Sequence, residues 1–259
     1  MSYDPIVLAR IVERKVCEER NNTPFRRYYR FRGGRWYGGC AAADCIGCNL
    51  RCRFCWSWSR GSYQLSGGYL CSPEEVCRRL YSIAIERKYK YVRISGGEPT
   101  LCREHLLRVI ERFENTKINF ILETNGILIG YDDDYAKTLA RFKRLIVRVS
   151  LKGTCPEEFH KLTGAMPEAF NYQLKAIEKL INYGMIPGEQ VYPAVMLSFS
   201  DEENIEKLLD KLRSIHPVLA EAIDPEYVIL YPHVVQLMKK FNLKPKIAYT
   251  PNNIPKFMI

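Results

Sequence analysis

Three closely spaced cysteines are the residues of this chain that most clearly indicate a chemical role. Cys48, Cys52 and Cys55 lie on one short loop at spacing C-x3-C-x2-C, and Phe54 directly precedes the third. Three thiolates on such a loop can bind three irons of a four-iron cube and leave the fourth iron without a protein ligand. Closed electron-transfer clusters use four cysteines. The loop therefore indicates a cluster in which one iron is kept open for another ligand.

A fourth cysteine leaves two other kinds of site open. Cys45 extends the pattern to C-x2-C-x3-C-x2-C, which suits a closed iron–sulfur cluster or a structural zinc site. Cys45 also falls in the apolar run 41–46, where a buried strand residue is expected. A non-catalytic iron–sulfur or zinc-binding protein is therefore one alternative function.

A glycine-rich turn is the second stretch of interest. Gly96 and Gly97 follow a predicted strand and are followed by Glu98, Pro99 and Thr100. Glycines let a backbone approach a ligand closely because no side chain intervenes. Such a turn is also common where only chain geometry requires it, so by itself it does not establish a binding site.

Alternating strands and helices must position these two stretches. Strands are predicted at 41–46, 90–95, 118–122, 145–151, 191–199 and 227–230, with helical segments between them. Six strand–helix repeats predict parallel strands joined by right-handed crossovers. Because a closed barrel has eight such units, we expect an α/β fold, a partial (β/α)6 TIM-type barrel. Both stretches follow strand ends and should meet on one rim.

The chain divides into three predicted regions, which are an N-terminal helical and hairpin extension (1–37), the partial barrel (38–241) and a C-terminal tail (242–259). Residues 1–24 are predicted to be helical. In 25–37, arginines and aromatics alternate around Gly33 and Gly34, which predicts a hairpin with a two-glycine turn. We favour a hairpin that closes the barrel, with aromatics inward and arginines in water, over a basic surface for RNA or a phosphorylated ligand.

Composition narrows the cellular setting. The 259 residues include ten cysteines and carry a net charge of +10, with basic residues concentrated near the N-terminus. No secretory signal or membrane-spanning run is visible, so we expect a cytoplasmic protein without membrane contact. Thiols there stay mostly reduced, although Cys71 and Cys77 could pair. Buried, unreactive thiols are expected at the cysteines outside the loop, namely Cys40, Cys71, Cys77, Cys102 and Cys155.

The four histidines are weak candidates. His105 and His160 are predicted to lie on helix surfaces, and His216 ends a helix. Only His233 is placed on the rim. An acidic triple at 132–134 is interpreted as the start of a helix rather than a cation site.

Together, the cysteine loop and the Gly96–Thr100 turn resemble the two signature motifs of the radical SAM superfamily. The resemblance implies a 4Fe–4S cluster on Cys48, Cys52 and Cys55, with S-adenosylmethionine on the open iron. It further implies that Phe54 packs near the adenine and that the turn contacts the methionyl amino group through Gly96, Gly97, Glu98 and Pro99. Reduction of the cluster would release a 5′-deoxyadenosyl radical that abstracts hydrogen from a substrate.

Within that superfamily, residues 38–235 are most similar to the activating enzymes of glycyl radical enzymes, such as the pyruvate formate-lyase activase. Thr124-Asn125-Gly126 resembles their third-strand motif, with Glu123 in place of Asp. Ser150-Leu151-Lys152 is similar to their Asp-x-Lys, which places Lys152 at the cosubstrate carboxylate as a further catalytic residue. Further cofactor contacts implied by the resemblance are Glu123, Thr124, Asn125, Ser150 and His233.

Three features depart from the activating enzymes. Ser150 replaces the usual acid, Ser57 stands where they carry Asn, and the N-terminal region differs from theirs. The class implies an electron donor such as a ferredoxin or flavodoxin, and a macromolecular substrate such as a protein glycyl loop. RNA is the alternative substrate, motivated by five arginines at positions 26, 27, 30, 32 and 35. The sequence does not identify the substrate.

Overall fold

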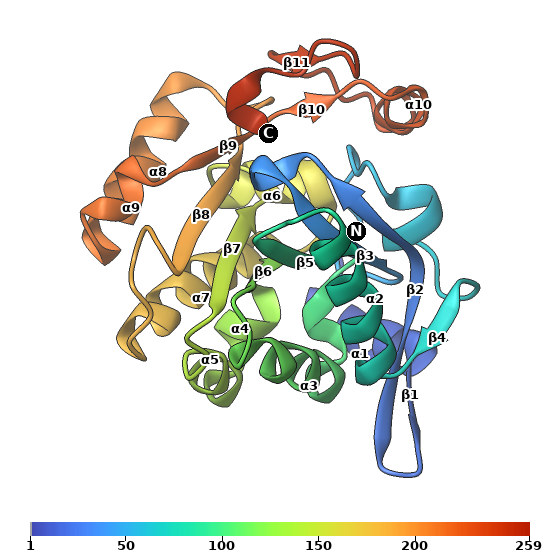
Figure 1. Ribbon diagram of the computed structural model, residues 1–259. Helices are drawn as coiled ribbons and strands as arrows, with labels where there is room; N and C mark the ends of the chain where they lie inside the picture. Colours follow the sequence, from blue (N-terminus) through green and yellow to red (C-terminus); the bar gives the residue numbers. More distant parts are fainter. Residues whose placement is uncertain (1) are drawn as a thin grey trace.

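A curved sheet with six adjacent parallel strands forms the centre of the computed structural model, which describes residues 2–259 (Figure 1). Helices cover its outer face, so the predicted partial (β/α)6 barrel is confirmed. The parallel strands, in spatial order, are β3 (Cys40–Cys45), β5 (Tyr91–Gly96), β6 (Asn119–Thr124), β7 (Leu145–Leu151), β8 (Val191–Met196) and β9 (Asp224–Glu226).

Ten α-helices lie among the described residues, and several begin with side-chain caps. Ser72 and Glu75 form a complete capping box at the start of α2. Asp132 caps α5, so the acidic triple does serve a helix start. The helices are α1 (Pro5–Val16), α2 (Pro73–Glu86), α3 (Arg103–Glu114), α4 (Ile127–Tyr131), α5 (Asp133–Leu139), α6 (Pro156–Thr163), α7 (Phe170–Asn182), α8 (Glu202–Ile215), α9 (Val218–Glu221) and α10 (Pro232–Lys240).

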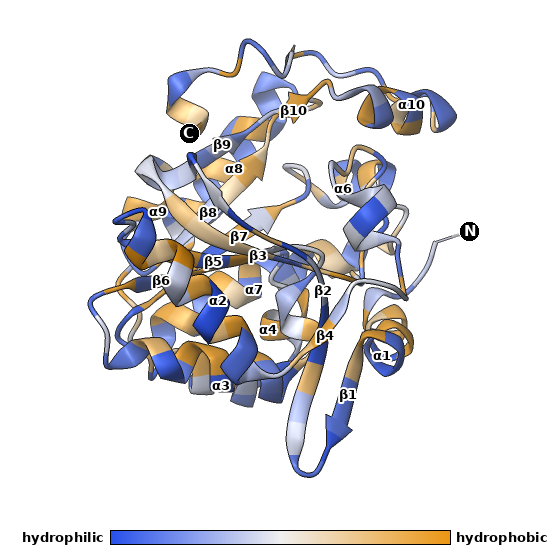
Figure 2. Ribbon diagram, turned by 45° about the vertical axis from the view of Figure 1, so that its right-hand side comes forward, coloured by the Kyte–Doolittle hydropathy of each residue, from blue (hydrophilic) through white to orange (hydrophobic). Residues whose placement is uncertain are grey.

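The N-terminal hairpin exists, but its predicted turn was wrong. Strand β2 (Thr23–Gly34) runs straight through Gly33 and Gly34, which pair with β3. The turn is at Asn21 and Asn22, both with left-handed φ, and it joins β2 to β1 (Cys17–Arg20). The helix predicted for 1–24 therefore ends at Val16, and the prediction was wrong for 17–24. Asparagine tolerates that conformation. Figure 2 shows this hairpin projecting from the body, with β1 largely hydrophilic.

The arginines of β2 do not form one exposed basic surface. Arg26 is 1% exposed, so the prediction that these arginines lie in water was wrong for it. Arg30 and Arg32 both contact the buried Asp44, and Arg27 donates to the Gly67 carbonyl. A short strand, β4 (Tyr69–Cys71), pairs with the other edge of β2. RNA binding stays a prediction, without the surface that motivated it.

The last barrel strand precedes the segment predicted for it. β10 (Val228–Ile229) pairs with β11 (Ala248–Tyr249) in a separate two-stranded sheet, so 227–230 is not the sixth barrel strand. β9 occupies that place with the sequence Asp-Pro-Glu, which has no apolar pattern to reveal it. The segment after α10 carries β11 and a short 3-10 helix (Lys256–Met258) and lies above the barrel rim (Figure 1).

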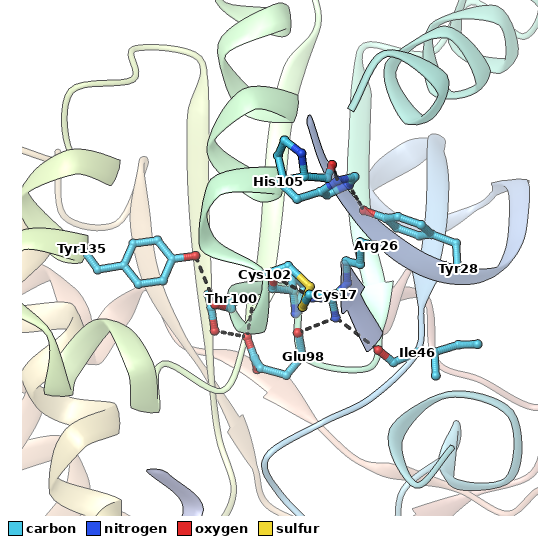
Figure 3. Close-up of a disulfide and its surroundings, with 11 residues drawn as sticks. Cys17, Arg26, Tyr28, Ile46, Glu98, Thr100, Cys102, His105 and Tyr135 are labelled. Atoms are coloured by element: carbon cyan, nitrogen blue, oxygen red, sulfur yellow. Dashed lines mark hydrogen bonds between the residues drawn. A yellow bond between two sulfur atoms is a disulfide. The ribbon is translucent and has the colours of Figure 1, made fainter. Parts of the chain in front are cut away.

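A disulfide joins the hairpin to the start of α3 (Figure 3). It links Cys17 to Cys102, so the free, unreactive thiol expected at Cys102 was wrong. Cys71 and Cys77 are free thiols, so the pairing considered for them was wrong as well. His105 lies beside it and is buried rather than on the surface. Its Nδ1 donates to the Pro24 carbonyl at 3.0 Å, which leaves Nε2 to accept from the Tyr28 hydroxyl at 3.0 Å. Burial lowers the pKa of His105 to about 4.

Substituting Gly130 by alanine should destabilise the fold strongly. Helices α4 and α7 pack so closely that a Cβ at Gly130 would lie 1.9 Å from the Tyr172 carbonyl oxygen. Forcing them apart should lower the free energy of unfolding by about 3 kcal/mol, measured by urea denaturation. Ser82→Ala, on the exposed face of α2, is the matched control. Equal stability of the two variants would contradict this packing.

Candidate active site

The cysteine loop opens onto a large cavity at the carboxyl ends of the barrel strands. Cys48, Cys52 and Cys55 line this cavity, whose volume is about 1150 Å³. Cys48 and Cys52 are 9% and 8% exposed, and Cys55 is half-buried. Since active sites of parallel barrels lie at this end of the strands, the loop is where chemistry is expected.

Backbone contacts hold the cysteine loop against the Gly96–Gly97 turn. The Gly97 N–H donates to the Cys45 carbonyl at 2.9 Å, and the Glu98 N–H donates to the Gly47 carbonyl at 2.8 Å. A Cβ at Gly97 would lie 2.2 Å from the Gly47 oxygen. Gly96 and Gly97 also line the cavity. The glycines thus let the two loops approach each other, a role that the sequence analysis did not distinguish from ligand approach.

Arg26 connects the same two loops through its buried side chain (Figure 3). Its guanidinium donates to the Ile46 carbonyl at 3.3 Å, on the cysteine side, and to the Glu98 carbonyl at 2.8 Å on the glycine side. A third bond, of 3.3 Å, reaches the Pro99 carbonyl. Buried carbonyls need such donors, so this arginine fixes the relative position of the two loops. Sequence reasoning missed it because arginine usually predicts exposure.

The Glu98 carboxylate accepts hydrogen bonds from other residues of the protein. It accepts from the Thr100 and Thr124 hydroxyls, both at 2.6 Å, and from the Asn125 N–H at 2.8 Å. Glu98 is 2% exposed and reaches the cavity wall, whereas Pro99 is buried and does not line the cavity. The glycine turn and the Thr124–Asn125 segment are therefore joined into one unit.

Asn125 reaches from β6 to the cysteine loop. Its Nδ2 donates to Asn49 Oδ1 at 2.7 Å and lies 3.9 Å from Cys48 Sγ. Asn49 Nδ2 is buried and has no partner among the described residues. Thr124, Asn125 and Phe54 all line the cavity, and the ring of Phe54 packs 5.6 Å from that of Phe199. The structure thus brings these predicted residues together around the loop.

Strands β7 and β9 supply a charged group on the opposite side of the cavity. Lys152 Nζ contacts the Ser150 hydroxyl and lies 3.3 Å from Glu226 Oε2, and Ser150 donates to the same carboxylate at 2.6 Å. Burial favours the neutral acid, but Lys152 and Arg148 outweigh it and lower the pKa of Glu226 to about 2. Glu226 and Arg148 were missed. Arg148 interrupts an otherwise apolar strand, which was the available signal.

Glu123, a predicted cofactor contact, lines the cavity and belongs to a charged cluster whose other members were missed. It accepts from Arg93 Nη1 at 2.6 Å and from the Tyr37 hydroxyl. Burial is again outweighed, here by Arg93 and Arg148, which lower the pKa of Glu123 to about 2. Arg93 likewise stands in an apolar strand, so charges within barrel strands could have marked this wall.

Of the remaining residues considered from the sequence, His233 lines the cavity, whereas Cys155 and Cys45 do not. The Nε2 of His233 donates to the Trp56 carbonyl at 2.7 Å. Cys45 is fully buried and follows Asp44 in β3, so the two side chains point to opposite faces. Asp44 meets arginines that line the cavity, and hence Cys45 points away from it.

The donor set fits an open cluster better than a zinc ion. Among residues 2–259, no three His, Cys, Asp or Glu side chains converge as ligands of a single metal ion. A cube needs thiolates set further apart, one for each of three irons, and three thiols on one loop face one cavity here. Burial raises the pKa of the Cys52 thiol to about 12, so cluster binding must displace its proton.

Acid should weaken the fold partly through Glu123. Because its folded pKa lies below the ordinary value of 4.5, its stabilisation is complete above about pH 4.5 and is lost as the pH falls toward 2. Glu123→Gln should therefore reduce the loss of unfolding free energy between pH 6 and pH 3 by up to about 2 kcal/mol. Denaturant titrations at both pH values measure this. Glu206→Gln, at an exposed position, is the control. If the unfolding free energy depends on pH identically in both variants, this role of Glu123 is refuted.

The arrangement of barrel, cysteine loop and glycine turn defines an α/β enzyme class, and sequence comparison identifies it. The profile of the radical SAM superfamily matches residues 45–212. The chain belongs to this superfamily, which uses a 4Fe–4S cluster and S-adenosylmethionine. None of the described helices is long and apolar enough to cross a membrane.

Curated relatives carry a more specific name. The chain is 30% identical over 173 residues to a "Probable GTP 3′,8-cyclase" of Methanococcus vannielii, covering 66% of this chain and 54% of that protein. It is 31% identical over 191 residues to a protein of the same name from Methanococcus maripaludis, covering 72% and 59%. The chain thus spans little more than half of these relatives. They are not named as glycyl radical activating enzymes, so that finer resemblance is not confirmed.

Solved structures share the fold at low sequence identity. HydG, a maturase of the [FeFe]-hydrogenase, superposes with a TM-score of 0.57 at 16% identity, covering 82% of this chain and 51% of HydG. TYW1 with a lysine–pyruvate adduct gives a TM-score of 0.51 at 16% identity, covering 90% and 87%. At these identities the likeness concerns the fold alone.

Proposed function

We propose that the chain cleaves S-adenosylmethionine reductively and directs the resulting radical to a substrate held in the cavity. One observation carries the proposal, which is the convergence of the cysteine loop, the glycine turn and the Ser150–Lys152 segment on one cavity. When bound, the cluster and its cosubstrate supply one electron and a 5′-deoxyadenosyl radical. The protein contributes position and charge.

The residues around the cavity divide this work. Cys48, Cys52 and Cys55 would hold the cluster, and Asn125 fixes the loop beside Cys48. Lys152, kept charged by Glu226, would meet the carboxylate of the cosubstrate. Phe54 offers an apolar surface for its adenine. Hydrogen bonds from Arg26 keep the two loops in register while a ligand enters.

The test is formation of 5′-deoxyadenosine by anaerobically reconstituted, dithionite-reduced protein. Wild type should form it, and Cys52→Ala should lose at least about 1000-fold of the rate, because a ligand of the reacting centre is removed. Cys45→Ala, which alters a buried cysteine outside the cavity, should keep activity within about tenfold. Absence of product from wild type, or full activity of Cys52→Ala, would refute the proposal.

Two substrates suit this reaction, each for its own reason. Activation of a glycyl radical enzyme is favoured by the Thr124-Asn125-Gly126 and Ser150-Leu151-Lys152 segments that resemble the activating enzymes. A nucleotide is favoured by the curated relatives named GTP 3′,8-cyclases. Transfer of deuterium into 5′-deoxyadenosine separates them. Label arriving from deuterated GTP supports the nucleotide, and label from a glycine-deuterated protein loop supports activation.

A further inference from the structure

Two arginines on one side of the cavity share a single counter-charge. Arg30 Nε lies 2.7 Å and Arg32 Nε 2.9 Å from Asp44 Oδ2, and both arginines line the cavity. The Asp44 side chain is fully buried, whereas that of Arg30 is 43% exposed. One carboxylate cannot neutralise two guanidiniums. This group therefore presents one unmatched positive charge to the cavity, and the terminal nitrogens of Arg30 have no protein partner among the described residues.

Two further donors beside this pair also lack partners. Arg93 is 5% exposed and lines the cavity, and its Nε has no hydrogen-bond acceptor among the described residues. Arg32 and Arg93 lie opposite the same residue of β3, Ala42, one from each side. The buried hydroxyl of Tyr29, next to Arg30, is likewise without a partner. Unsatisfied buried donors are rare, so these mark a place for an acceptor.

The rest of the cavity has nearly balanced charge. Glu123 is matched by Arg93, and Arg148 is bound by both Asp224 and Glu226. Glu226 also forms an ion pair with Lys152. Acidic residues on that side would repel an anion, whereas the group formed by Arg30, Arg32 and Asp44 would attract one. Apart from Arg60, which lines the cavity and forms no ion pair among the described residues, the excess positive charge lies on the wall formed by β2, β3 and β5.

We propose that this wall binds an anionic group of the substrate, either a phosphate or a carboxylate. The planar fork of an arginine matches both groups through paired hydrogen bonds, and Arg30 presents its free end to the cavity. The proposal rests on the proposed function, since it names the chemistry of the substrate that the radical would attack. It makes Arg30 and Arg32 determinants of specificity.

Anion binding can be measured without the radical reaction. Reconstituted protein, oxidised and without S-adenosylmethionine, is titrated calorimetrically with inorganic pyrophosphate and, separately, with succinate. At least one probe should bind, and Arg30→Gln should weaken that probe at least about tenfold. Arg32→Gln should act in the same direction. Stronger binding of pyrophosphate assigns the site to a phosphate group, and stronger binding of succinate assigns it to a carboxylate.

Arg27→Gln is the matched control, since Arg27 lies on the same strand but does not line the cavity. It should bind the probe as wild type does. The proposal is overturned if neither probe binds or if Arg30→Gln keeps wild-type affinity for the probe. It is also overturned if Arg27→Gln loses as much affinity as Arg30→Gln does. The half-exposed Arg30 can be replaced without emptying the core, so folding does not obscure the result. Failure to form 5′-deoxyadenosine would instead refute the proposed function, whatever the probes show.

Discussion

Replacing Arg26 by methionine should lower the free energy of unfolding by about 3 kcal/mol and impair cosubstrate cleavage. The change leaves three buried carbonyls, those of Ile46, Glu98 and Pro99, without their donor. An unsatisfied buried acceptor costs about 1–3 kcal/mol, and relief from burying the guanidinium offsets part of the sum. Urea denaturation measures the loss.

Arg27→Met is the control for this variant, because the Arg27 side chain is partly exposed and, among the described residues, donates only to the Gly67 carbonyl. It should cost less than about 1 kcal/mol. Arg26→Lys keeps the charge but cannot reach three acceptors with the same fork, so it should fall between wild type and Arg26→Met. If Arg26→Met and Arg27→Met were equally stable, Arg26 would not be holding the two loops together.

Replacing Gly97 by alanine should reduce the formation of 5′-deoxyadenosine by about 100-fold, because misplacement of reacting groups by about 1 Å has that effect. The new Cβ would lie 2.2 Å from the Gly47 carbonyl oxygen, and neither atom belongs to a side chain that can move aside. The glycine turn must therefore separate from the cysteine loop. Initial rates under anaerobic reduction measure the effect.

Gly67→Ala separates this steric effect from backbone strain. Gly67 has a left-handed φ of 79°, and a Cβ there would meet nothing within 4 Å. Its substitution should cost stability through strain but should leave the rate nearly unchanged. A Gly97→Ala enzyme as fast as the Gly67→Ala enzyme would show that the contact between the two loops does not govern the reaction.

Most of the barrel could be predicted because its strands are short apolar runs that end at glycine or polar residues. The strand predicted at 145–151 coincides with β7. β9 was not predicted because its place in the sheet comes from pairing with β8, not from its residues Asp-Pro-Glu. The predicted Gly33–Gly34 turn was wrong because both glycines pair with β3, a long-range contact that the local pattern does not specify.

The candidate site could be predicted where a local motif marks it. Cys48, Cys52, Cys55 and the Gly96–Gly97 turn each form a contiguous pattern. The Cys17–Cys102 disulfide joins residues 85 apart, and neither cysteine belongs to a motif. The charged wall could not be assembled either, because Arg30, Asp44 and Arg93 come from three strands. Their convergence depends on the pairing of β2 with β3, which local patterns do not specify.

The most direct test of the account is the electron paramagnetic resonance spectrum of the reduced cluster with and without S-adenosylmethionine. A cluster held by Cys48, Cys52 and Cys55 has an open iron, so the cosubstrate should change the spectrum of wild type. The same change should occur in Cys45→Ala, since that thiol points away from the cavity. A spectrum that S-adenosylmethionine leaves unaltered would indicate a closed four-cysteine cluster and contradict the central claim.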